Sequence, residues 1–100
     1  MSQQEEMMQD ELNEAFWTRT DAVIQLANTQ AEEADADDVN ASLLYAAARF
    51  SSFLIAAQAE DHASLLHGRD QAVDYFANQF RQLLAENIDD YLENFDEYNA

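Results

Sequence analysis

Two histidines, His62 and His67, are the residues of this sequence best suited to bind a metal ion or transfer a proton. Their spacing of five places them about 140° apart around an α-helix, whereas zinc-binding histidines on a helix are four residues apart and share one face. The sequence has no HExxH motif, and the absence of cysteine excludes thiolate ligands and thiol nucleophiles. We therefore expect two surface histidines near a helix start, with no metal site and no cofactor.

A cluster of acidic residues lies at positions 32–38, where five of seven side chains are Asp or Glu. Carboxylates that lie close together can bind Ca²⁺. An EF-hand loop that begins at Asp35, however, requires glycine at its sixth position and glutamate at its twelfth, where this sequence has Asn40 and Ala46. We interpret the cluster as a solvated loop that attracts cations without specificity.

Other arrangements that could support catalysis are also missing. Asp89 and Asp90 are adjacent, so on a helix their carboxylates point to different faces and do not form an acid-base pair. The sequence contains no glycine-rich phosphate loop and no nucleophile elbow, and no Ser-His-Asp arrangement can be assembled from it. We expect no enzymatic activity.

Arg49 is the only charged residue in the largely apolar segment 41–59. A guanidinium group in such a segment must find an anionic partner or extend to the solvent. We expect it to form a buried ion pair that fixes the register of two helices, with Asp21 as the first candidate partner and Asp70 or Asp74 as the others. The functional alternative is an arginine that binds an anionic ligand.

The elements that carry these residues are predicted to be helices. The 100 residues include one glycine and no proline, so residues that form turns are scarce. Apolar residues recur at steps of three and four, which predicts helices over residues 11–34, 41–60 and 64–97. Residues 1–10 are mostly polar, and although Ser2 and Glu5 have capping-box spacing, we interpret them as a frayed acidic arm before a single domain at 11–100.

The predicted fold is an all-α, antiparallel bundle of three helices. The second helix is apolar around most of its circumference, which is typical of a helix at the centre of a domain. We expect Asn40 to cap its N-terminus, and Asp61 or Ser64 to cap the third helix. The third helix would be about 50 Å long against about 30 Å for the second, so it either bends near Gly68 or Asn87 or extends beyond the bundle.

The end of the third predicted helix has an apolar face with nothing in the bundle to cover it. An isolated segment of this length is poorly stable without tertiary burial. We therefore expect this face to be an interface with another copy of the chain, formed by Ile88, Tyr91, Leu92, Phe95 and Tyr98.

The charge of the chain limits its partners. Acidic residues outnumber basic ones 21 to 4, for a formal net charge of -17. The four arginines are dispersed, so we expect no binding to nucleic acid or to anionic membranes. We find no apolar run approaching the roughly 20 residues that span a bilayer and no features of a signal peptide, and we expect a cytoplasmic location. The acidic surface either keeps the protein soluble or mimics the phosphates of DNA.

Part of the sequence resembles a known family. The stretch 42–50, Ser-Leu-Leu-Tyr-Ala-Ala-Ala-Arg-Phe, the residues around Phe16-Trp17 and Leu26-Ala27-Asn28, and the ending over 75–96 are similar to small bacterial proteins known as domain of unknown function 3144. The resemblance covers about 80 residues. It implies a free-standing, helical, bacterial cytoplasmic protein, and it carries over no catalytic or binding residues.

Taken together, these features predict a non-enzymatic structural or protein-interaction module that forms homo-oligomers. The alternative is an acidic decoy or adaptor that binds a basic protein partner. A small enzyme that binds a ligand or a metal ion is the third and least favoured hypothesis.

Overall fold

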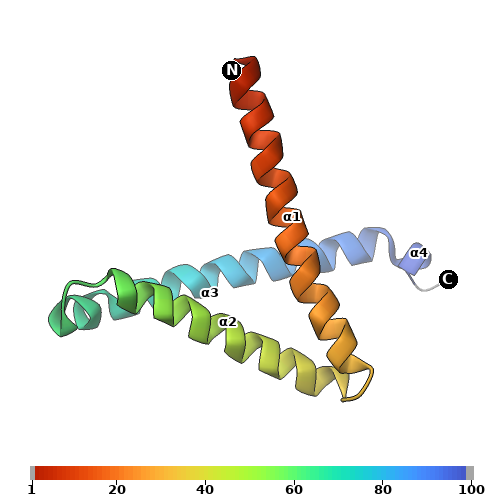
Figure 1. Cartoon of the computed structure of the whole chain (residues 1–100). Coiled ribbons are helices and arrows are strands. Elements are labelled where there is room, and N and C mark those ends of the chain that lie inside the picture. Colours follow the sequence, from red (N-terminus) through yellow and green to blue (C-terminus); the bar gives the residue numbers. More distant parts are fainter. Residues whose placement is uncertain (1, 99–100) are drawn as a thin grey trace. The chain divides into compact units, whose positions relative to one another are not determined.

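The computed structural model describes residues 2–98, except for the side chain of Tyr98, and this part of the chain contains helices and no strands. In chain order the helices are α1 (Gln3–Ala31), α2 (Ala36–Gln58), α3 (His62–Glu93) and the single turn α4 (Phe95–Tyr98), as Figure 1 shows. The predicted all-helical fold is confirmed. The chain divides into two units, Met1–Ser51 and Ser52–Ala100, and the boundary falls within α2.

Helix α1 begins at Gln3, inside the segment that we expected to be a frayed arm. The N–H of Glu5 donates a hydrogen bond to Oγ of Ser2 at 3.2 Å, and the N–H of Ser2 donates one to the Glu5 carboxylate at 3.4 Å. These reciprocal bonds satisfy backbone donors that a helix start otherwise leaves unpaired. The capping box therefore starts the helix even though few apolar residues follow it.

Helix α2 begins at Ala36, and the residue that caps it is Asp35 rather than Asn40. The N–H of Asp37 donates a hydrogen bond to Oδ1 of Asp35 at 2.8 Å, and the N–H of Val39 donates one to the Asp35 carbonyl at 3.1 Å. Asp37 and Asp38 then occupy the first turn, where the helix dipole favours negative charge. The expected acidic loop is therefore a short turn at residues 32–35 followed by helix.

Helix α3 begins at His62, two residues before the predicted start, and Asp61, one of the two predicted caps, is its N-cap, with the N–H of Ser64 as the donor at 2.8 Å. It continues without a break through Gly68 and Asn87, the two positions at which the sequence left open a bend. The Asn87 side chain donates to the Leu83 carbonyl one turn earlier, at 2.7 Å, and so does not interrupt the backbone pattern. The helix ends instead at Asn94, whose φ of -111° and ψ of 26° leave the helical region.

Side-chain burial is slight in both units. In the part of the chain that the structure describes, Val39 is the one buried hydrophobic residue, with 8% of its surface exposed. In the first unit it lies against α1 at a small hollow that is also lined by Val23, Leu26 and Leu43. Among the described residues, Val39 is therefore the one position at which α2 is buried.

One of the described helices, α2, is long and apolar enough to cross a membrane, with a mean hydropathy of 1.3 over its most apolar window. This corrects our interpretation of the sequence, in which no segment reached the required length. The core helix of a soluble protein meets the same two criteria of length and composition, so they do not by themselves assign α2 to a bilayer.

Candidate functional site

The most extended feature in the second unit is an apolar face along α3, which we call the α3 stripe. Its side chains follow one another at steps of three or four residues, which places them on one side of the helix. Each exposes between 40% and 67% of its surface. The α3 stripe consists of Val73, Phe76, Phe80, Leu84, Ile88, Tyr91 and Leu92, and Phe95 continues it into α4.

The structure places four of the predicted interface residues at the end of this stripe. Ile88, Tyr91, Leu92 and Phe95 are 50%, 55%, 67% and 57% exposed, respectively. The fifth, Tyr98, ends α4, and its side chain lies outside the described part of the chain. Our prediction of the interface stopped short of Phe76, Phe80 and Leu84, although the same periodicity includes them.

The face that α3 directs towards the end of α2 is different from the stripe. Apart from Asn94 after the end of α3, the least exposed positions within the described part of the second unit are Ile55 and Ala59, together with Leu65, Gly68 and Ala72 of α3. Ala72 precedes Val73 by one residue, which corresponds to about a quarter of a turn around the helix. The stripe adjoins this less exposed face at Phe76, which follows Ala72 by about one turn, and diverges from it from Phe80 onward.

Charge is distributed unevenly along α3 and α4. Residues 86–97 contain six acidic side chains and no basic one, whereas residues 71–82 contain Asp74 and Arg81 and have no net charge. Arg81 is exposed beside the stripe, three residues before Leu84. The stripe thus runs from a nearly neutral segment into a strongly negative one.

The predicted ion pair of Arg49 and Asp21 does not form as a buried contact. Both residues are exposed in the first unit, so the guanidinium group reaches water and needs no buried counter-ion. The ion pair that the described residues do form joins Arg69 to its neighbour Asp70 at 2.6 Å, with side chains 69% and 88% exposed. An exposed pair of this kind contributes about 0–1 kcal/mol to stability.

The two histidines lie in the first turns of α3, and both are exposed. Among the described residues no group of three or more histidine or acidic side chains could hold a metal ion.

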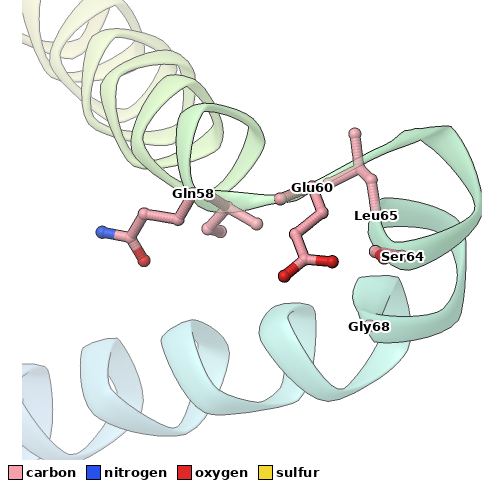
Figure 2. Close-up of a pocket in the computed structure, with 7 residues that line it drawn as sticks. Gln58, Glu60, Ser64, Leu65 and Gly68 are labelled. Atoms are coloured by element: carbon pink, nitrogen blue, oxygen red, sulfur yellow. The ribbon is translucent and has the colours of Figure 1, made fainter.

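A shallow hollow of about 270 Å³ lies between the end of α2 and the start of α3, within the second unit. Figure 2 shows the Glu60 carboxylate in the opening, with Ser64, Leu65 and Gly68 of α3 on the other side. Its other lining residues are Ile55, Gln58 and Ala59. Besides the Glu60 carboxylate, the polar side chains that line this open hollow are those of Gln58 and Ser64.

Fold and surface together define an all-helical protein whose longest helix presents an exposed apolar face. The chain belongs to the family described as protein of unknown function (DUF3144), whose model matches residues 16–92. The match confirms the resemblance noted in the sequence, and it includes the α3 stripe as far as Leu92. No curated protein and no solved structure matches the chain.

Proposed function

We propose that this protein is a non-enzymatic structural or interaction module that forms homo-oligomers through the α3 stripe. The observation that supports the proposal is the exposure of the stripe, 40–67% at each side chain. Contiguous apolar surface of this kind marks an interaction site in soluble proteins, because leaving it in water is unfavourable.

The proposal includes an antiparallel arrangement of the three long helices. Their connections, residues 32–35 and 59–61, are short, and short connections favour antiparallel neighbours. The 23 residues of α2 span about 35 Å and the 32 residues of α3 about 48 Å. If α3 runs antiparallel to α2, it reaches the level of the N-terminus of α2 near residue 85. Ile88 and Leu92 would then extend beyond the bundle and require a second chain to cover them.

Size-exclusion chromatography with light scattering over a wide concentration range tests this proposal. We expect a mass of at least two chains of 11.4 kDa at micromolar concentration. A mass of one chain at every concentration, with helicity retained in circular dichroism, would contradict it.

The acidic decoy or adaptor remains the second candidate because of the charge. The formal net charge is -17. The ion pair found among the described residues neutralises one acidic side chain, that of Asp70. A basic protein partner recognised in this way should bind more weakly as salt rises, since salt screens exposed charges. A complex that resists salt would rule out this mode of recognition.

We further propose a cytoplasmic, non-membrane location. If α2 crossed a bilayer, Arg49 would lie near the middle of the helix, where inserting an arginine costs about 2.5–3.5 kcal/mol. Two further charged residues, Asp37 and Asp38, occupy the first turn of the same helix. Fractionation of cells should recover the protein in the supernatant. Recovery in a membrane pellet that withstands an alkaline wash would contradict this location.

A further inference from the structure

We propose that the α3 stripe pairs with the α3 stripe of a second copy in antiparallel orientation, with the two-fold axis at Leu84. This inference rests on the proposed self-association and adds the face, the orientation and the register of the partner. It concerns α3 and α4 alone, which belong to one unit.

The register follows from the spacing of the stripe. Phe80 and Ile88 lie four residues on either side of Leu84, Phe76 and Leu92 lie eight on either side, and Val73 and Phe95 lie eleven on either side. In an antiparallel pair centred on Leu84, the residues of the first two pairs, which lie within α3, are therefore opposite an apolar residue of the partner, whereas Phe95 follows the end of the helix at Asn94. Tyr91 is opposite the small Ala77 at the same register, which leaves room for its ring.

The exposed area is sufficient for a specific interface. Val73, Phe76, Phe80, Leu84, Ile88 and Leu92 expose 54%, 40%, 52%, 47%, 50% and 67% of their surface. At these exposures each large apolar side chain offers on the order of 100 Å². Six such side chains in each copy would bury about 1,200 Å², which is the lower bound for stable protein interfaces.

Charge favours the antiparallel orientation over the parallel one. A parallel pair would align residues 86–97 of both copies and place two segments with six acidic side chains each at the same level along the pair. An antiparallel pair centred on Leu84 places residues 86–97 opposite residues 71–82, which have no net charge and include Arg81. Like charges opposite one another are destabilising, and antiparallel helices also align their dipoles favourably.

Distances between spin labels on the two copies test the orientation. The chain has no cysteine, so Gln71→Cys and Gln82→Cys each introduce a single labelling site on the side of α3 away from the stripe. With the axis at Leu84, the two labels at position 71 are separated along the helix by about 39 Å and those at position 82 by about 6 Å. We expect the distance at position 71 to exceed that at position 82 by about 20 Å.

Equal distances at the two positions, in a sample that light scattering shows to be a dimer, would overturn the antiparallel pairing and leave the proposed self-association intact. A monomer with no dipolar coupling would overturn both, and would indicate that another part of the same chain covers the stripe.

A pair of charge substitutions tests the face. Leu84→Glu places two carboxylates against each other at the proposed axis, and we expect self-association to weaken at least about 10-fold, as for a buried like-charge contact. The matched control, Gln82→Glu, adds the same charge on the opposite side of α3 and should change association less than about 2-fold. Equal effects of the two substitutions, with helicity retained in both, would overturn the proposed face.

Discussion

The backbone N–H of Ser64 donates a hydrogen bond of 2.8 Å to Oδ1 of Asp61 and closes the first turn of α3. Because this bond stabilises the charged carboxylate, it lowers the pKa of Asp61 below the ordinary value for aspartate, and a hydrogen bond with the Ser64 side chain acts in the same direction. A group whose pKa is lower in the folded state stabilises the fold above its unfolded pKa. This contribution is lost as the pH falls through the lowered value.

We predict that Asp61→Asn keeps the cap but removes this pH dependence, since asparagine is an equally good N-cap residue. The melting temperature of the variant should fall less than that of the wild type as the solution is acidified below the ordinary pKa of aspartate. Asp61→Ala, which removes the acceptor altogether, should melt earlier than both at neutral pH. Identical acid profiles for the wild type and Asp61→Asn would contradict the prediction.

The start of α2 provides a direct contrast between two residues with similar capping ability. Asp35→Ala should destabilise the protein by about 1 kcal/mol, because it removes the acceptor for the Asp37 N–H. Asn40→Ala should have little effect or be slightly stabilising, since Asn40 lies inside the helix, where alanine is favoured. Chemical denaturation monitored by circular dichroism measures both, and the opposite order would contradict the assigned helix start.

A substitution of Val39 tests whether α1 and α2 pack against each other. We expect Val39→Ala to lower the free energy of unfolding by about 1–2 kcal/mol, because the substitution removes two buried methyl groups from the contact with α1. Tyr45→Ala on the same helix is the control, since Tyr45 is 71% exposed. If the two variants unfold at the same denaturant concentration, α1 and α2 do not pack through Val39.

Salt should stabilise the protein and its assembly at neutral pH. Each chain has a formal net charge of -17, so bringing two chains together adds repulsion that added salt screens over about 10 Å at 0.1 M. The melting temperature and the dimer fraction should both rise with sodium chloride. A dimer that dissociates on addition of salt would show that ion pairs, rather than the apolar stripe, hold it together.

Several features of the fold could be predicted because their causes are local. The all-helical content follows from composition and from apolar periodicity, and the cap at Asp61 follows from one side chain and an amide three residues away. The predicted start of α1 is wrong because the capping box at Ser2 starts a helix even though the apolar pattern after it is weak. The predicted start of α2 is wrong because Asp35 and Asn40 are both good N-caps, and local preference does not discriminate between them.

The amino-acid sequence by itself therefore determined the helices, the absence of thiol chemistry, the net charge and the family, all of which depend on residue types and on neighbours within a turn or two. Only the arrangement in space decided that Arg49 and Asp21 remain exposed, that α3 runs straight through Gly68 and Asn87, and that Val39 is the point of burial among the described residues. The physical reason is that backbone hydrogen bonds in a helix join residues four apart, whereas burial depends on which distant side chains come to lie on each face.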